Sequence, residues 1–519
     1  MTITKRMLLG SAATLAAIST TQAADLPVKA KPVQYVKICD LYGSGFYYIP
    51  GSDICLKVGG YAQADYGWNN SNNAFAPTYT GARAAMDRTA IHYVTRARAE
   101  SNFDSRTQTA YGTLRTYMVL RLENADGASA FQVPRAFIQW AGFTLGRSKS
   151  IADVPGGPTP DTFRSLHQNQ NVSDTGGGGT NFAAYSWELG NGMVLSVGAE
   201  ERRTKAIANL SNNVVTVGTN PGTAFGPYEH PNPFINFSVN QAWGRFGTSV
   251  YFNKVNATYY NNADPVAATL DSGSTQGTNA VAAVPGTGCP TGAGAQPGTS
   301  QCGHPDDKWG WVVLSGIDIK APWAGPGDHF GGFFNYGVGA AAYSGGGNLG
   351  SPGLFGANNT VALGVITDGV FVNGGQFQLT TAWSAGAGYE HFWLPNVSTA
   401  VYGNFTAIRY NDTVINSRLF CNGAGANAVN QNIRGIAASV SCDPGFNYWT
   451  VGMVNNWFPV PGFRLAVDVL WIKIDTAFDG QHISLGKTTG LRPTGVYTAK
   501  DIGNLSVVFR AQRLFGAAD

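Results

Sequence analysis

The sequence predicts an all-β protein: a transmembrane antiparallel β-barrel of about 16 strands, with short periplasmic turns and long extracellular loops. Three observations support this fold class. Polar and apolar residues alternate along many segments, short and long connections alternate between those segments, and charge is scarce. The chain has 67 glycines but only 13% charged residues, whereas a soluble protein usually carries about 25% charge.

Segment 56–68 shows the clearest alternation. Apolar and small side chains fall at even positions, ending in Tyr66 and Trp68, while Gln63 and Asp65 fall at odd positions. Successive side chains of a strand point to opposite faces, so this strand has one apolar and one polar face. It is also long enough to cross a bilayer, which takes about 9–11 residues in a tilted strand.

The same alternation recurs in four further segments: 95–105, 111–123, 463–475 and 505–511. In segment 463–475 we expect Val467 to face lipid and Ala466 to face the interior. A soluble sandwich would also give each strand one apolar face, so the alternation alone does not settle the fold class.

The lengths of the connections favour a membrane barrel over a soluble sandwich. Seven short turns are expected near 106–107, 141–142, 190–192, 244, 322–327, 395–396 and 459–462. Eight long loops are expected at 69–90, 124–130, 150–180, 203–232, 257–307, 345–373, 411–445 and 476–501. Fifteen connections join sixteen strands, and short turns at one end with long loops at the other are typical of membrane barrels.

Tryptophans mark the expected membrane interfaces, because amphipathic rings settle at the level of the lipid headgroups. Seven of them lie at or near expected strand ends: Trp68, Trp140, Trp187, Trp243, Trp323, Trp393 and Trp457. A barrel of sixteen strands is too wide for its own side chains to fill, so it leaves an aqueous channel.

The N-terminal residues have the pattern of a secretory signal peptide. Lys5 and Arg6 precede an apolar run at 7–18 that is too short for a membrane-spanning helix, and Ala23 marks the expected cleavage site. We therefore expect a signal peptide at 1–23. It would be followed by an N-terminal periplasmic segment at 24–55, a barrel at 56–515 and a C-terminal extension at 516–519.

The six cysteines form three sequence-local couples, which in a secreted chain predict disulfides. The couples are Cys39 with Cys55, Cys289 with Cys302, and Cys421 with Cys442. No CxxC or HxxxH spacing supports a metal site, and we expect no cofactor. The net charge of +3 gives no basic surface for nucleic acid.

No group of residues predicts catalysis. The seven histidines are scattered, and the glycines at 176–179 lack the lysine of a phosphate-binding loop. Asp306 and Asp307 could contact calcium, but the ligand pattern of a calcium site is missing, so a solvated loop is the favoured interpretation.

Three segments resemble one protein family. They are ADLPVKAKPVQYVKICDLYGSGFYYIPGSDICLKVGGY from Ala24, RAFIQWAGFTLGRSKS at 135–150, and VVFRAQRLF at 507–515. The family is that of the alphaproteobacterial outer-membrane porins, the rhizobial and Brucella-type general porins. The resemblance implies sixteen strands, one loop folded into the lumen and, commonly, a homotrimer. Such porins usually end on an aromatic residue, whereas here Phe515 is followed by 516–519.

The resemblance places the lumen loop after the fifth strand, at 150–180. This loop carries Asp153, Asp161, Asp174 and Arg164, and we expect it to face Arg96, Arg98, Arg115 and Arg121 across the opening. Charge rings at a constriction set ion preference. Alternatively, these arginines only pair locally on the wall with Glu100, Asp104 and Glu123.

The function implied is passive diffusion of small hydrophilic solutes and ions across the outer membrane of a Gram-negative cell. The expected partners are membrane lipid, lipopolysaccharide and two further copies of the chain. A substrate-selective channel, for sugars for example, is the alternative. A barrel enzyme and a secreted adhesin are less favoured.

Overall fold

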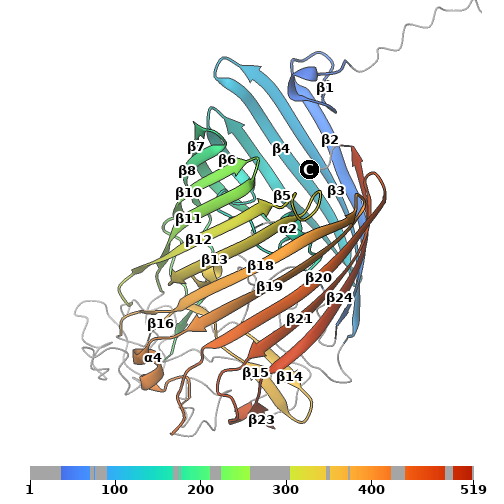
Figure 1. Cartoon of the computed structure of the whole chain (residues 1–519). Helices are drawn as coiled ribbons and strands as arrows, with labels where there is room; N and C mark the ends of the chain where they lie inside the picture. The colour runs from blue at the N-terminus through green and yellow to red at the C-terminus, as the bar shows by residue number, and fades with distance from the viewer. Residues whose placement is uncertain are drawn as a thin grey trace, which may run out of the picture.

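The computed structural model describes residues 37–69, 75, 91–167, 175, 177–210, 224–257, 304–345, 351–371, 375–421, 439–485 and 495–516. Within these ranges sixteen strands form one closed antiparallel barrel (Figure 1), as the sequence predicted. The expected signal peptide at 1–23, Asp174 and the Cys289–Cys302 couple lie outside the described residues. No helix in the described ranges is long and apolar enough to cross a membrane.

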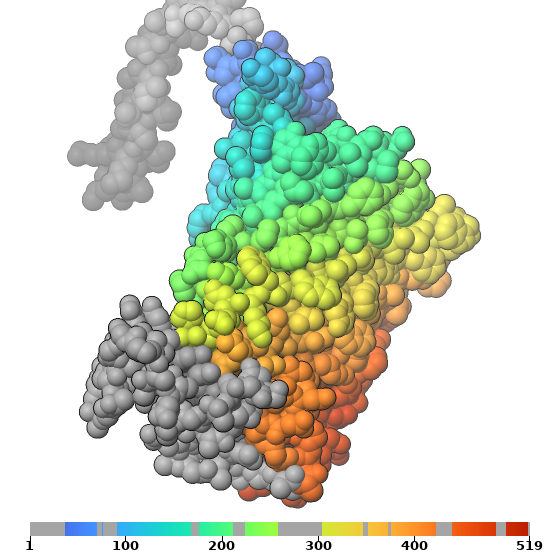
Figure 2. Space-filling model, turned by 90° about the vertical axis from the view of Figure 1, so that its left-hand side faces the viewer, coloured from blue at the N-terminus to red at the C-terminus, as the bar shows by residue number. Residues whose placement is uncertain are grey.

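Each barrel strand pairs with the next one along the chain, and the last strand pairs with the first to close the ring. The strands are β2 (Cys55–Asn69), β3 (Tyr93–Thr109), β4 (Gly112–Ala125), β5 (Ala128–Trp140), β6 (Phe143–Ser148), β7 (Thr180–Gly190), β8 (Met193–Glu200), β10 (Asn232–Gln241), β11 (Gly244–Val255), β12 (Lys308–Lys320), β13 (His329–Val338), β18 (Thr381–Leu394), β19 (Val397–Arg409), β20 (Phe446–Val460), β21 (Phe463–Asp475) and β24 (Ile502–Gly516). Figure 2 shows them as bands of changing colour that slant across one side of the barrel.

The two ends of the barrel carry different elements. At the short-turn end, η2 (Asp40–Tyr42) and β1 (Tyr47–Tyr48) lie beside the start of β2. The long-loop end carries two small sheets and two short helices, which together we call the loop cap (Figure 1). Its elements are β9 (Ala206–Asn209), β16 (Thr367–Phe371), β17 (Gln378–Leu379), β14 (Gly353–Gly356), β15 (Thr360–Leu363), β22 (His482–Leu485), β23 (Gly495–Ala499), α3 (Ala341–Ser344) and α4 (Asp412–Ser417).

One connection expected to be long is a tight turn. β4 and β5 are joined by Asp126 and Gly127 alone, both with positive φ, at 49° and 82°. An Asp-Gly pair suits a two-residue hairpin because its backbone twist matches that of the flanking strands. The expectation of a loop at 124–130 was therefore wrong, since the turn chemistry of this dipeptide outweighs the polar character of its flanks.

The β3–β4 hairpin is longer than the turn expected at 106–107. Both strands continue to Thr109 and Gly112. Arg106 on β3 and Arg115 on β4 both bind the Asp104 carboxylate, at 2.7 Å and 2.9 Å. The inward charges of Arg106 and Arg115 therefore belong to the paired part of β3 and β4 and do not mark the turn between them.

The alternation predicted the strand faces correctly. Val467 is 37% exposed on the outside of β21, whereas Ala466 is 3% exposed on the inside. All seven tryptophans named above are exposed, between 40% and 73%. Ala466 nevertheless belongs to a packed apolar cluster, so the inner face is not open at every position.

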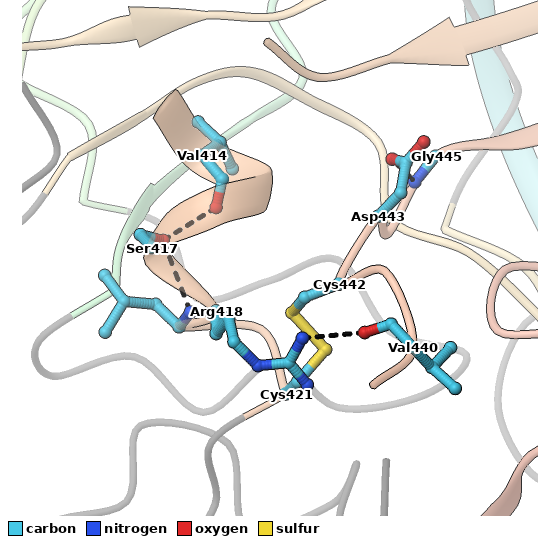
Figure 3. Close-up of a disulfide and its surroundings, with 9 residues drawn as sticks. Val414, Ser417, Arg418, Cys421, Val440, Cys442, Asp443 and Gly445 are labelled. Carbon is cyan, nitrogen blue, oxygen red and sulfur yellow. Dashed lines mark hydrogen bonds between the residues drawn. A yellow bond between two sulfur atoms is a disulfide. The ribbon is translucent and has the colours of Figure 1, made fainter. Parts of the chain in front are cut away.

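Two of the three expected disulfides lie within the described residues, and both are present. Cys39 joins Cys55 and fastens η2 and β1 to the first barrel strand. Cys421 joins Cys442 in the loop cap (Figure 3). Beside it, Arg418 Nη1 donates to the Val440 carbonyl oxygen at 2.6 Å.

Candidate functional site: a lumen loop facing a charged wall

The described first part of the connection between β6 and β7, up to residue 167, runs along the inside of the barrel. Its backbone passes so close to β12 and β13 that a Cβ at Gly156 would lie 2.0 Å from the Ile317 carbonyl oxygen and 2.4 Å from that of Gly332. Gly156 also has a φ of +87°, so glycine is required at this crossing. The helix α2 (Pro160–Phe163) follows, and Figure 1 draws it within the outline of the barrel.

The helix α2 docks on charged groups of the inner wall. The buried Phe163 ring stacks on the His329 imidazole, with 5.4 Å between centroids. The imidazole contacts Asp318 through Nδ1 at 2.8 Å and Glu390 through Nε2 at 3.0 Å. Arg164 Nε donates to Glu390 Oε1 at 3.1 Å. A row of alternating charge on β12, β13 and β18 therefore holds this part of the loop.

Beyond α2 the loop is fastened to β21. The buried Asp468 carboxylate accepts hydrogen bonds from the Leu166 amide at 2.7 Å and the Ser165 hydroxyl at 3.3 Å. Tyr402 on β19 donates to the same carboxylate at 2.8 Å. Hydrogen bonds to a charged acceptor contribute about 1.5–3 kcal/mol each, so this carboxylate is a firm anchor for the loop.

The beginning of the loop is anchored separately. The Ser150 hydroxyl lies 2.5 Å from Glu200 Oε2 and 2.6 Å from the Tyr251 hydroxyl. Arg203 forms an ion pair with Glu200 at 2.8 Å. Asp153 is also part of this root: it accepts hydrogen bonds from Thr175 and lies 3.8 Å from Arg203. The structure thus places Asp153 at the base of the loop, and the lumen arginines are not among these partners.

One contact near the loop has the residue types of a hydrolase triad. His167 lies between Ser506, at 3.1 Å from Nε2, and Asp468, at 3.0 Å from Nδ1. The Nδ1 contact lacks hydrogen-bond alignment, and all three side chains are fully buried. A buried hydroxyl offers no surface to a substrate, so we interpret this group as a further anchor of the loop.

The wall formed by β24 and β2 to β5, which follows β21 around the ring, carries the arginines singled out in the sequence. Arg96 binds Asp65 through Nε at 2.8 Å and Nη2 at 2.5 Å. Arg510, on β24, binds the other oxygen of Asp65 at 2.7 Å. Two guanidinium groups therefore share one buried carboxylate across the strand pairs β2–β3 and β2–β24.

The remaining arginines are paired in the same way with carboxylates of neighbouring strands. Arg98 binds Glu123, and Arg121 binds Glu100 at 2.7 Å. Arg115 and Arg106 share Asp104, as described above. In these pairs six guanidinium groups meet four carboxylates, so the paired groups together carry a formal charge of +2.

Arg121 also links the wall to the loop. Its Nη1 donates to the Gly177 carbonyl oxygen at 2.5 Å, at the point where the loop returns to β7. The local pairs that the sequence suggested for Glu100, Asp104 and Glu123 are present, and Asp65 and Arg510 extend them.

The loop exposes its own charges to the lumen. Asp161 is 57% exposed at its side chain and pairs with Lys149 at 2.6 Å, while the Arg164 side chain is 39% exposed. Desolvation by the surrounding wall opposes ionisation of Asp161, but Lys149, followed by Arg135 and Arg245, outweighs it and holds the pKa of this carboxyl below its usual value. Asp161 therefore lies in a positive field to which β5 and β11 both contribute.

Several anchoring residues were not found from the sequence. Asp65 and Asp468 lie at inward positions of alternating strands, and this parity was their only available signal. Glu200 and Glu390 stand near strand ends, where parity is hardest to assign. Their partners in the loop are far away in sequence, so only the fold brings them together.

Comparison with known proteins agrees with this architecture. A family model described as "Porin subfamily" matches residues 25–499. Porin Omp2b of Brucella melitensis biotype 1 is 33% identical over 212 residues, which are 38% of this chain and 54% of that protein. Porin Omp2a of Brucella ovis is 32% identical over 222 residues, which are 38% of this chain and 59% of that protein. The chain thus spans about half the length of the curated relatives it matches.

The fold also has a solved counterpart. The crystal structure of the outer membrane channel DcaP of Acinetobacter baumannii aligns with a TM-score of 0.53 at 14% identity, covering 90% of this chain and 99% of that one. Identity at this level supports the fold alone. The family match covers most of the chain, from residue 25 to the end of β23 at residue 499, and of the barrel strands only β24 lies beyond it. The chain therefore belongs to the porin subfamily.

Proposed function

We propose that this outer-membrane protein is a general porin, a channel for passive diffusion of small hydrophilic solutes and ions. The observation that carries the proposal is the loop 150–167, which crosses the inside of a closed sixteen-stranded barrel. A barrel of this size encloses an aqueous lumen, and the loop narrows that lumen and leaves the wall intact.

The constriction in this proposal lies between the loop and the wall of β2 to β5. On the wall it is lined by Arg96, Arg98, Arg115 and Arg121. On the loop it is lined by Asp161 and Arg164, with Asp153 holding the loop root. Because the paired groups of the wall carry a formal charge of +2, we propose a preference for anions.

Conductance across a planar bilayer tests this proposal. Purified protein should give stable single-channel steps, and a variant lacking residues 156–176 should give larger steps while its barrel stays folded. The deletion removes the part of the loop that crosses the lumen and leaves Ser150, the main anchor of its root, in place. Unchanged conductance in a folded deletion variant would mean that another segment sets the pore width.

We also propose a homotrimer, because the barrel wall is shorter at β6 than elsewhere and leaves part of β5 without a neighbouring strand. β6 has six residues, fewer than the about 9–11 that a tilted strand needs to cross the bilayer. Residues 128–132 and Arg135 of β5 pair with β4, and the pairing of β5 with β6 begins only at Ala136. Phe131 in this stretch is 62% exposed. Backbone groups of an unpaired strand edge are costly in lipid because they lack hydrogen-bond partners. We therefore propose that a second copy of the chain covers this part of β5.

The oligomeric state tests this part. Native mass spectrometry in detergent should give a trimer, and Phe131→Arg should weaken it while leaving the monomer folded. The matched control is Phe334→Arg on β13, since Phe334 is 51% exposed on the wall across the barrel. If only the control substitution dissociates the oligomer, the interface lies elsewhere.

Nothing in the described lumen favours a sugar-selective channel over a general one. Tyr402 is fully buried and hydrogen-bonded to Asp468, and Tyr117 packs on Phe137. Neither ring is free to form a slide for sugars. In the described loop 150–167 the exposed residues are Pro160 and Asp161, and neither is aromatic.

A further inference from the structure

One arginine of the lumen loop is held in a strained backbone conformation. Arg164 follows the last residue of α2 and has a φ of +54°, in the left-handed region. This region costs free energy for a residue with a Cβ, and glycine or asparagine adopts it more easily. Residues held in this way are concentrated at functional sites. The strain therefore directs attention to what the Arg164 side chain does in the lumen.

The guanidinium of Arg164 has one engaged edge and one free edge. Its Nε donates to Glu390 Oε1 at 3.1 Å. Within the described part of the chain, Nη1 and Nη2 have no hydrogen-bond partner, and neither nitrogen is among the buried ones. The side chain is 39% exposed, so an anion in the lumen can reach both free donors.

A second arginine supports the first from β21. Arg464 donates through Nη2 to the Arg164 carbonyl oxygen and through Nε to Asn456 Oδ1 at 2.9 Å. In the described residues no carboxylate forms an ion pair with Arg464. Its positive charge therefore acts on whatever occupies the space beside the Arg164 guanidinium.

The carboxylates near these two arginines have other partners. Glu390 is fully buried, and it also accepts a hydrogen bond from the Ser398 hydroxyl at 2.6 Å and contacts His329. Asp468 is buried beneath the loop, as described above. These two carboxylates balance the two arginines. Farther along the wall, the two guanidinium groups that share Asp65 leave one positive charge in excess. One excess charge suits a monoanion, whereas Glu390 would repel the second charge of a phosphate.

Two phenylalanine rings flank the Arg164 guanidinium. Its central carbon lies 5.7 Å from the ring centre of Phe392 and 5.7 Å from that of Phe458. Both residues lie near the short-turn ends of their strands, β18 and β20, and both are partly exposed. The rings hold the plane of the guanidinium and add apolar surface next to it.

The geometry points to a binding site for a small organic monocarboxylate with an apolar body, such as an aromatic acid, at the short-turn end of the lumen. The carboxylate binds Nη1 and Nη2 of Arg164, because the free edge of a guanidinium matches two carboxylate oxygens. The apolar body lies against Phe392 and Phe458. The inference rests on the proposed channel, since it names a class of solute for the constriction.

Benzoate is the probe that tests the site, with acetate and inorganic phosphate for comparison. Saturation-transfer NMR of detergent-purified full-length protein measures binding without requiring conduction, and interruptions of single-channel current measure it in the open pore. Arg164→Gln removes the free edge and one charge. Arg245→Gln is the matched control, because it removes one charge from another exposed lumen arginine, which pairs with Asp318. Phe458→Leu tests the apolar contact, and heat-resistant migration shows that each variant is folded.

We expect Arg164→Gln to weaken benzoate binding about tenfold or more, because a two-pronged charge-assisted contact is lost. Arg245→Gln should change it by about twofold at most, because a more distant charge acts only through a field that salt screens. Phe458→Leu should weaken binding of benzoate but not of acetate.

Three results would overturn the inference. They are equal weakening by Arg164→Gln and Arg245→Gln, displacement of benzoate by an equal concentration of phosphate, and no benzoate binding by the unaltered protein. Each of them leaves the channel proposal in place as long as single-channel steps are seen. Benzoate binding that depends on Arg164 in a protein without such steps would support the site and contradict the channel.

Discussion

Arg98 on β3 and Glu123 on β4 are direct cross-strand neighbours, and the guanidinium Nε donates to Glu123 Oε2 at 2.7 Å. The pair lies on the inner face with both side chains mostly shielded, at 14% and 17% exposure. Substituting the arginine alone changes the net charge of the wall, whereas substituting both members of the pair leaves that net charge unchanged.

The first prediction uses this difference. Arg98→Gln removes one positive charge from the wall and should shift ion selectivity toward cations. Arg98→Gln combined with Glu123→Gln leaves the net charge unchanged and should restore the original selectivity. The reversal potential under a salt gradient measures both. An equal shift in the single and double variants would show that the wall charge does not control selectivity.

The second prediction concerns the face that meets lipid. Val467→Arg should destabilise the barrel by about 2–4 kcal/mol if the site is near the bilayer midplane. Gln132→Arg, at an exposed inward position of β5 near Arg121, should cost much less because it enters a polar lumen. Urea unfolding in lipid vesicles gives both values. Ala466 is not a suitable control, because its side chain is buried.

The third prediction concerns the loop cap. The Cys421–Cys442 disulfide spans 21 positions, and closing such a loop stabilises it by about 3 kcal/mol in the chain-entropy model. Replacing both cysteines by serine should make the described residues beside the disulfide, α4 and 439–445, more susceptible to protease while the barrel stays intact. The Cys39–Cys55 pair provides the comparison, since its loss should loosen only η2 and β1. If the unaltered protein with its disulfide and the serine variant are digested identically, the expectation is wrong.

The fourth prediction is a pH dependence of the cap. Asp368 lies on β16, fully buried, and burial raises its pKa to about 6 despite hydrogen bonds from the Lys205 and Ala341 amides. Burial lowers the pKa of Lys205 to about 8. The positive charge of Arg202 and the buried Tyr410 also act on this carboxyl.

The signs follow from linkage. Because the folded pKa of Asp368 exceeds its unfolded value, the folded cap binds more protons, and this group contributes stability that is lost as pH rises toward about 6. Lys205 binds fewer protons when folded, so its contribution rises as pH increases above about 8. The cap should therefore be least protected between these values.

Hydrogen exchange of the β9 and β16 amides, corrected for intrinsic rates, measures this protection. Asp368→Asn should abolish the acid side of the dependence, because the amide stays neutral, although its single oxygen can accept only one of the two backbone hydrogen bonds from Lys205 and Ala341. Lys205→Met should abolish the alkaline side. A flat profile in the unaltered protein would contradict both assignments.

The barrel could be predicted from sequence because alternation and turn spacing are local patterns. The faces of Val467 and Arg96 followed from strand parity alone. The constriction could be predicted from the sequence only in part. The pairing of Arg98 with Glu123 could be suggested from the alternation of the two strands. The place of Asp153 at the loop root could not, because it depends on Arg203 and Thr175, whose positions only the folded loop defines.

The closing seam has a consequence for assembly. Asp65 on β2 and Arg510 on β24 are separated by 445 positions, so their contact can form only after almost the whole chain is available. Until then β2 and β24 each present an open strand edge, which is a template for mispairing with other chains. Ring closure is therefore a late, long-range event, and a chaperone that shields these two edges during transit would protect the assembly step most exposed to aggregation.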